Sequence, residues 1–262
     1  MRRWVWILLI VGCASHRLDA PQSSRILERP LLASGQRLLE YDGYSAVFDS
    51  SRHIPLWVGY ILRPQDLQGG VPRYRGRFSV DAKVPGCPTH DAYRAFEGKY
   101  ERGHLAPSAD FRRSAALQKD TFLMTNVAPQ LGCFNRGIWL ALEDAVREWT
   151  RNSEEVFVTT GPLASDQCSK EDGAICIPRA FFKAVLKQGP QGKQAIGFLF
   201  PHRCDPERGI AAFSMSVDEL ERHTGLDFFA ALEDTEESRL EAHVEGDWFT
   251  ASIAQKARPR RR

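Results

Sequence analysis

Two stretches of the chain concentrate the residue types that can hydrolyse a phosphodiester. Residues 99–111, KYERGHLAPSADF, contain Arg102 and His104, and residues 125–144, TNVAPQLGCFNRGIWLALED, contain Asn135 and Glu143. Such hydrolysis at neutral pH needs a base for water, positive charge for the transition state and a cation at the leaving oxygen. A neutral histidine, arginines, and an amide oxygen with a carboxylate beside hydrated Mg²⁺ meet these needs. The two stretches therefore predict a hydrolytic site.

Each of these residues also has a simpler interpretation. His104 can be a structural histidine, and Asn135 precedes a helical pattern of apolar residues as an N-cap residue would. Glu143 and Arg147 are four residues apart, which is the spacing of a salt bridge on a solvated helix face. The order and spacing of all these residues together favour the catalytic interpretation.

The same residues resemble the signature of a known family. ERGHLAP at residues 101–107, TNVAPQ at 125–130 and FNRGIWLALED at 134–144 look like the motifs of the DNA/RNA non-specific endonucleases. These are ββα-metal nucleases that include the endonuclease G type. The resemblance covers about residues 36–247.

The resemblance implies a role for individual residues. His104 would be the general base, Asn135 the direct protein ligand of Mg²⁺, with Mn²⁺ as a candidate substitute, and Glu143 would hold the waters of the metal. The remaining implied roles are phosphate binding by Arg102, Arg147 and Arg77, and support of the site by Glu101, Asn126 and Gln130.

The resemblance implies an Mg²⁺-dependent endonuclease that cuts DNA and RNA with little sequence preference and leaves 5′-phosphate ends, and the N-terminal residues described below predict that it is exported. Glu101 departs from the family, which usually has the shorter Asp there. That departure is the one motif feature that favours an alternative, a catalytically inactive nucleic-acid-binding lipoprotein on the same fold. A phosphodiesterase of small nucleotides is a third hypothesis, and it would require a closed pocket. The family contains dimers, so a homodimer stays open, and the sequence identifies no inhibitor protein.

The elements around these motifs predict an α+β fold, with a mostly antiparallel central sheet, flanking helices and a ββα-metal motif. Alternation in residues 36–64 about a turn at 49–52 predicts strands, as do residues 155–163, 177–186 and 195–200. One helix is expected from near Asn135 to about Asn152, and another after the N-cap Ser216. Arg73, Arg75 and Arg77 would share one side of an extended segment. We assign residues 36–250 to the nuclease domain.

The first 13 residues, MRRWVWILLIVGC, have the features of a signal peptide. Two arginines precede an apolar run from Trp4 to Val11, which is too short to span a bilayer. The end resembles a lipobox that would place a lipid on Cys13 and tether the protein to a membrane, and ordinary cleavage after Ala14 is the alternative. We expect a bacterial cell-envelope lipoprotein, or a secreted or periplasmic protein, with a linker at residues 14–35 and a basic tail at 251–262.

Charge and cysteines add two expectations. Residues 60–151 hold 14 basic against 10 acidic residues, whereas residues 205–248 hold 3 against 13, so phosphate attraction should be local to the motifs. Cys168 and Cys176 are the expected disulfide in an oxidising compartment. Cys133 is considered as a nucleophilic thiol, although no histidine is near it in sequence. His202 and His223 are expected to be structural or surface residues.

Overall fold

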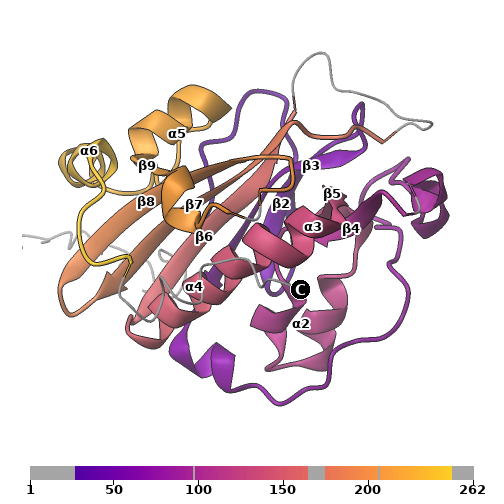
Figure 1. Ribbon diagram of the computed structural model, residues 1–262, viewed down its shortest axis with the longest axis horizontal. Helices are drawn as coiled ribbons and strands as arrows, with labels where there is room; N and C mark the ends of the chain where they lie inside the picture. Colours follow the sequence, from indigo (N-terminus) through magenta and orange to yellow (C-terminus); the bar gives the residue numbers. More distant parts are fainter. Residues whose placement is uncertain (1–26, 97, 165–174, 206, 250–262) are drawn as a thin grey trace, which may run out of the picture.

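The computed structural model describes residues 27–96, 98–164, 175–205 and 207–249 (Figure 1). Seven strands form one sheet in which every neighbouring pair is antiparallel, and this confirms the predicted sheet. The strands, in their spatial order, are β1 (Leu38–Glu40), β2 (Tyr44–Asp49), β3 (Ile54–Leu62), β6 (Glu155–Leu163), β7 (Ala180–Gly189), β8 (Gly192–Pro201) and β9 (Ser214–Met215).

The sheet separates two apolar cores. Because side chains alternate along a strand, Phe181 and Val185 of β7 enter the larger core, while Phe182 and Leu186 enter the smaller one. Helix α4 (Leu140–Arg151) covers the larger core, and α5 (Val217–Thr224) and α6 (Asp234–Ala242) cover the smaller one on the opposite face (Figure 1). The predicted α+β class with flanking helices is therefore confirmed.

A separate two-stranded ribbon carries the sequence motifs. Strand β4 (Tyr100–His104) pairs with β5 (Val127–Leu131) in antiparallel register, and β5 leads directly into α3 (Gly132–Phe134). A π-helical turn, η6 (Asn135–Trp139), joins α3 to α4, and the backbone kinks at Gly137, whose φ is −104° and ψ is −108°. The ribbon and α4 thus form the expected ββα arrangement. The remaining short elements are η2 (Pro64–Gln68), η3 (His90–Phe96), η4 (Ser108–Phe111), α2 (Ala115–Asp120), η5 (Met124–Asn126) and η7 (Ile210–Phe213).

Most predicted boundaries are confirmed, and one detail is wrong. Strand β6 has the predicted ends, and the Ser216 hydroxyl accepts a hydrogen bond from the Glu219 amide as the expected N-cap does. The helix of the second motif begins at Gly132, so Asn135 lies inside it and is not its N-cap. The segment with Arg73, Arg75 and Arg77 is neither helix nor strand, and the Arg73 guanidinium donates to the Ser108 hydroxyl while the Tyr74 amide donates to Gln118 Oε1.

Part of the expected linker is folded against the sheet. Leu27 and Glu28 are buried, and the Thr159 hydroxyl on β6 donates to the Glu28 carbonyl at 2.8 Å. Residues 27–35 therefore belong with the domain. The proposed signal peptide, the lipid on Cys13 and the basic tail fall at residues 1–26 and 250–262, outside the described residues, and stay predictions. Among the helices of the described ranges, none combines the length and the apolar character needed to cross a bilayer.

The disulfides change the interpretation of the cysteines. Cys133 at the start of α3 is bonded to Cys204 after β8, so it is not the nucleophilic thiol that the sequence left open. Cys176 is also disulfide-bonded, but its predicted partner Cys168 lies outside the described residues, and that pairing stays a prediction. Cys87 is buried and carries the free thiol found in the described ranges.

Candidate active site on the β4–β5 ribbon and helix α4

His104 has a buried ring nitrogen that makes no hydrogen bond within the described chain. It is the last residue of β4, and its ring packs against those of Phe78 and Phe122, with ring centroids 5.0 and 4.8 Å away. Its Nε2 is buried and finds no hydrogen-bond partner among the described residues. Burial, with a smaller contribution from Arg73, lowers the pKa of His104 to about 3, so the imidazole is neutral at pH 7. A neutral, unpaired Nε2 can accept a proton.

His202 shows the contrasting, structural arrangement. Its Nε2 accepts a hydrogen bond from the Leu131 amide at 2.8 Å, and its Nδ1 lies 2.9 Å from the Pro178 carbonyl. Both ring nitrogens are therefore used to join the ribbon to the segment before β7. This agrees with the structural role expected for His202.

Asn135 is held by the residue in which the motif departs from the family. The Asn135 side-chain amide, Nδ2, donates to Glu101 Oε2 at 2.8 Å. This bond uses the nitrogen side of the amide and leaves the oxygen, Oδ1, as the atom that can bind a hard cation. Glu101 also forms an ion pair with Arg136, and a side chain on Gly132 would come within 3.0 Å of both. The longer carboxylate of Glu101 thus reaches the predicted metal ligand.

Asn126 and Gln130 lie where supporting residues would lie. Asn126 Oδ1 accepts from the Ala106 amide at 2.8 Å, and its Nδ2 donates to the Ala106 and Thr121 carbonyls at 3.0 and 2.8 Å. These bonds fix the chain that follows His104. Gln130 is buried, and its side chain packs against the backbone of Gly103, in the space that a Cβ at residue 103 would need. Both residues shape the end of β4.

Glu143 belongs to a buried group of charges and not to a solvated helix face. Burial raises its pKa to about 7, and the positive charges of Arg147 and Lys183 oppose that rise. Lys183 on β7 is fully buried, with its Nζ 4.6 Å from the centroid of the Trp139 ring. The Lys183 Nζ has no hydrogen-bond partner within the described part of the chain. Burial lowers the pKa of Lys183 to about 8, while Glu143 and Asp110 favour its charged form.

Arg147 is held by two carboxylates. Its guanidinium donates to Asp110 Oδ1 and to Asp144 Oδ1, each at 2.7 Å. Asp110 is itself buried and also accepts from the Tyr60 hydroxyl at 3.2 Å. Arg147 therefore neutralises a buried carboxylate, and its predicted contact with a phosphate stays a prediction.

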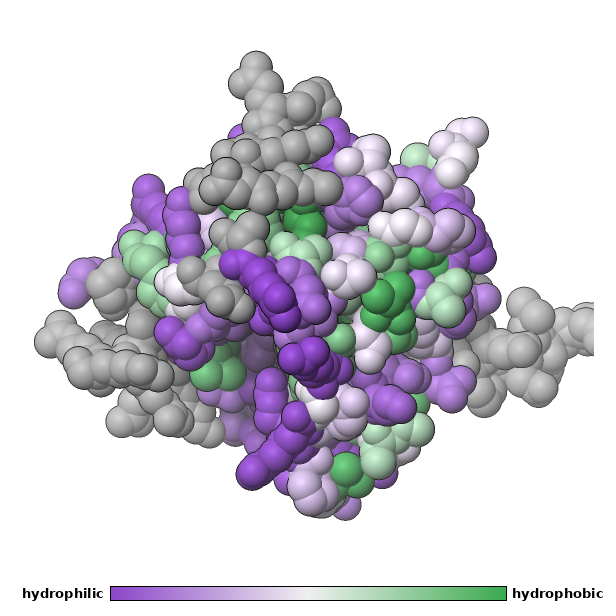
Figure 2. All heavy atoms as spheres, turned by 90° about the vertical axis from the view of Figure 1, so that its right-hand side faces the viewer, coloured by the Kyte–Doolittle hydropathy of each residue, from purple (hydrophilic) through white to green (hydrophobic). Residues whose placement is uncertain are grey.

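The other arginines divide between two neighbourhoods. Arg102 donates from Nη2 to the His90 carbonyl at 2.9 Å and lies 5.3 Å from the centroid of the Tyr93 ring. Arg102 and Arg77 both lower the pKa of His90, so these two cations share one region. Arg73 instead donates to the Ser108 hydroxyl at 3.0 Å and lies close enough to His104 to lower its pKa. Figure 2 shows hydrophilic side chains gathered over the middle of the face that lies at the right of Figure 1.

Three residues of this region were missed in the sequence. In the sequence, nothing distinguishes Arg73 from the neighbouring arginines, or Asp110 from the other carboxylates of the motif. Lys183 could have been found in the sequence, because it interrupts an apolar strand and lies on the same face of that strand as Phe181 and Val185. A lysine on the buried face of a strand needs anionic neighbours, and Glu143 and Asp110 provide them.

Comparisons with known proteins find nucleases that are similar in sequence and in fold. A family model described as DNA/RNA non-specific endonuclease matches residues 22–235. The chain is 31% identical to a nuclease of Syncephalastrum racemosum over 83% of this chain and 75% of that protein. It is 30% identical to human mitochondrial endonuclease G over 73% and 69% of the two chains. A crystal structure of an EndoG/EndoGI complex is similar in fold, with a TM-score of 0.71, 25% identity, and coverage of 82% of this chain and 95% of that chain.

Replacing Lys183 should impair the site through Glu143. Since Lys183 lowers the pKa of Glu143, we expect Lys183→Met to raise that pKa further and leave Glu143 protonated at pH 7. The rate of plasmid nicking at pH 7 should fall by about tenfold, and the acid limb of its pH profile should move to higher pH. Lys187→Met is the matched control, because Lys187 is on the same face of β7 but lies over Trp248. An unchanged pH profile for Lys183→Met would contradict this prediction.

Replacing Glu101 should weaken metal binding specifically. Without its carboxylate the Asn135 amide is no longer oriented, so Glu101→Ala should raise the Mg²⁺ concentration for half-maximal nicking by about 10–100-fold. Arg136→Ala is the control, since it removes the exposed ion pair and leaves the Glu101–Asn135 bond, and it should change that concentration little. Equal Mg²⁺ dependence of Glu101→Ala and the unmodified protein would exclude the orienting role.

Proposed function

This chain belongs to the DNA/RNA non-specific endonuclease family, and we propose that it is an exported endonuclease that depends on Mg²⁺, with Mn²⁺ as a substitute. The substrates are DNA and RNA, which are cut without sequence preference to products with 5′-phosphate ends. The observations that support this most are the unpaired, neutral Nε2 of His104 and the amide of Asn135 that Glu101 orients.

His104 acts as the general base. Its neutral form can take a proton from the water that attacks phosphorus, and the rings of Phe78 and Phe122 keep the imidazole in place. A bound phosphate brings negative charge close to the ring, which raises the pKa of His104 above its value in the free protein. Substrate binding thus makes His104 a stronger base at the moment it is needed.

The residues around α4 fit a hard cation. Asn135 offers an amide oxygen, because Glu101 engages its nitrogen. Glu143 supplies a carboxylate whose pKa is raised by burial, and the charges of Arg147 and Lys183 limit that rise. One amide oxygen as a direct ligand and a carboxylate that contacts the ion through water suit Mg²⁺, which keeps several of its waters. When bound, the cation supplies positive charge to the leaving 3′ oxygen.

The arginines bind the phosphate backbone. Arg102 and Arg77 share one region of the surface, and Arg147 is close to Glu143. A planar guanidinium contacts phosphate oxygens in two places at once. Contacts to phosphate and sugar carry no direct sequence information, which agrees with low sequence preference. Polar contact with a long backbone also favours nucleic acid over a small nucleotide as substrate.

Replacing His104 tests the catalytic assignment. His104→Ala should lower the rate of supercoiled-plasmid nicking in Mg²⁺ by about 10²–10⁴-fold while plasmid binding is retained, because only the proton acceptor is lost. His223→Ala, on the exposed side of α5, should retain the full rate. Excess EDTA should stop cleavage by the unmodified protein.

The alternative is an inactive nucleic-acid-binding lipoprotein. Binding of plasmid without cleavage in any of several divalent metals would replace the endonuclease proposal by that alternative. If His104→Ala cleaves plasmid at the same rate as the unmodified protein, the endonuclease proposal stands, but His104 is not the general base.

Export rests on the first 13 residues. Two arginines, an apolar run and the Gly12-Cys13 junction support processing at Cys13 and a lipid that anchors the protein in the cell envelope. In a bacterial host the intact mass of the purified protein should correspond to residues 13–262 with acyl chains on Cys13. An unmodified chain that begins at Ser15 would show ordinary cleavage, and retention of Met1 would contradict export.

A further inference from the structure

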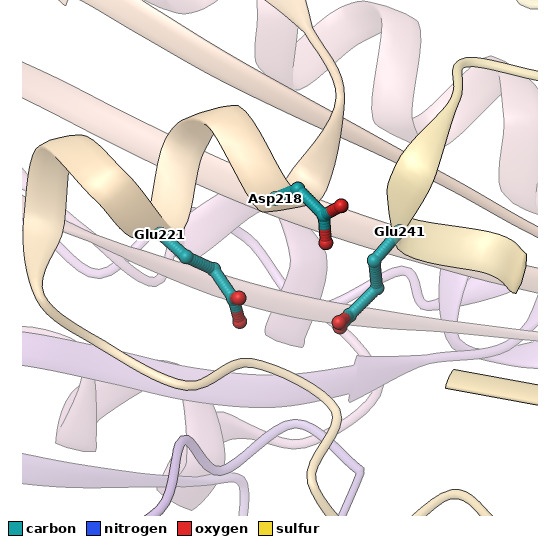
Figure 3. A group of neighbouring side chains, drawn as sticks. All are labelled: Asp218, Glu221 and Glu241. Carbon is teal, nitrogen blue, oxygen red and sulfur yellow. The ribbon is translucent and has the colours of Figure 1, made fainter. Parts of the chain in front are cut away.

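A second group of oxygen ligands lies on the face of the sheet away from the candidate active site. Asp218 and Glu221 are one turn apart on α5, and Glu241 projects from α6 (Figure 3). One carboxylate oxygen from each residue lies within 4.8 Å of the corresponding oxygens of the other two. Figure 3 shows the three carboxylates directed toward a common space between the helices.

Glu241 is the residue that most needs a ligand. Its side chain is buried, with only 5% of the residue exposed, and its Oε1 has no hydrogen-bond partner among the described residues. A buried carboxylate that is neither paired nor hydrogen-bonded is costly. Oε1 of the neighbouring Glu237 is also buried and has no partner within the described ranges. The unpaired Oε1 of Glu241 is therefore an oxygen that a bound cation would engage.

The basic residues of this region interact with groups other than the three carboxylates. Arg239 pairs with Glu245, Lys193 pairs with Glu236, and the Arg222 side chain donates to a backbone carbonyl. Within the described chain, no lysine or arginine forms an ion pair with the three carboxylates of the group. The protein itself therefore supplies no compensating charge.

We propose that Asp218, Glu221 and Glu241 form a structural Ca²⁺ site that ties α5 to α6. Ca²⁺ takes oxygen ligands at about 2.3–2.6 Å, so two ligands of one ion lie at most about 5 Å apart, which the three carboxylates satisfy. Ca²⁺ also tolerates irregular geometry and several carboxylates, whereas Mg²⁺ prefers few carboxylates and its own waters. The site is distinct from the predicted Mg²⁺ site at Asn135, because it lies on the other side of the sheet.

Titration with CaCl₂ tests the site in a variant that lacks the predicted Mg²⁺ ligand Asn135, so that only the second site can bind the ion. In Asn135→Ala, calorimetry should show one Ca²⁺ per chain, and Ca²⁺ at about 100 times its Kd should raise the Tm by about 5 °C. Adding Glu241→Gln should abolish both the binding and the shift, and its Tm without Ca²⁺ should be unchanged or higher because repulsion is relieved. Adding Glu219→Gln, on the same helix but outside the group, should change neither result.

Two results would overturn the proposal. One is the absence of Ca²⁺ binding in Asn135→Ala, and the other is a Ca²⁺-dependent Tm shift that persists in Glu241→Gln. Asp218→Asn provides a second variant at the exposed side of the group, so that a folding defect in one variant leaves the outcome decided by the other. Nicking in Mg²⁺ by Glu241→Gln with Asn135 intact should equal that of the unmodified protein, which separates this site from the catalytic one.

Discussion

The buried charges between α4 and the sheet are the constraint on which the candidate site depends. Asp110 and Glu143 are carboxylates in surroundings that disfavour charge, and Arg147 and Lys183 keep that charge tolerable. Removing one member leaves a buried charge without its partner, which costs more than the pair contributes. Because the four residues come from η4, α4 and β7, the group also fixes how the motif helix lies on the sheet.

Trp139 connects this charged group to His104, the proposed base. Its ring lies beneath the Lys183 ammonium, and its Nε1 donates to the His104 carbonyl at 3.3 Å. The same residue ends the π-helical turn that begins at Asn135. A turn of this kind changes the direction of side chains within a helix and is frequent at functional sites. Trp139 thus links the backbone of the predicted base to the turn that carries the predicted metal ligand.

The two faces of the sheet have opposite electrostatic character. The motif face carries Arg73 near His104 and Arg77 and Arg102 near His90, while α5 and α6 carry the acidic residues of 205–248. With the proposed function, the second face would repel a polyanionic substrate and the first would attract it. The carboxylates of α5 and α6 would also repel one another across their interface, which is the reason for a cation there.

The sequence alone determined the family, the antiparallel sheet and the identity of the motif residues, because those depend on local order, spacing and alternation. It also located strand β6 and the Ser216 cap, which are set by nearby residues. Only the tertiary structure showed that Glu101 reaches Asn135, that Lys183 faces Glu143 and that Cys133 bonds to Cys204. Each of these contacts joins residues far apart in the chain, and the packing of the ribbon, helix and sheet decides which of them meet.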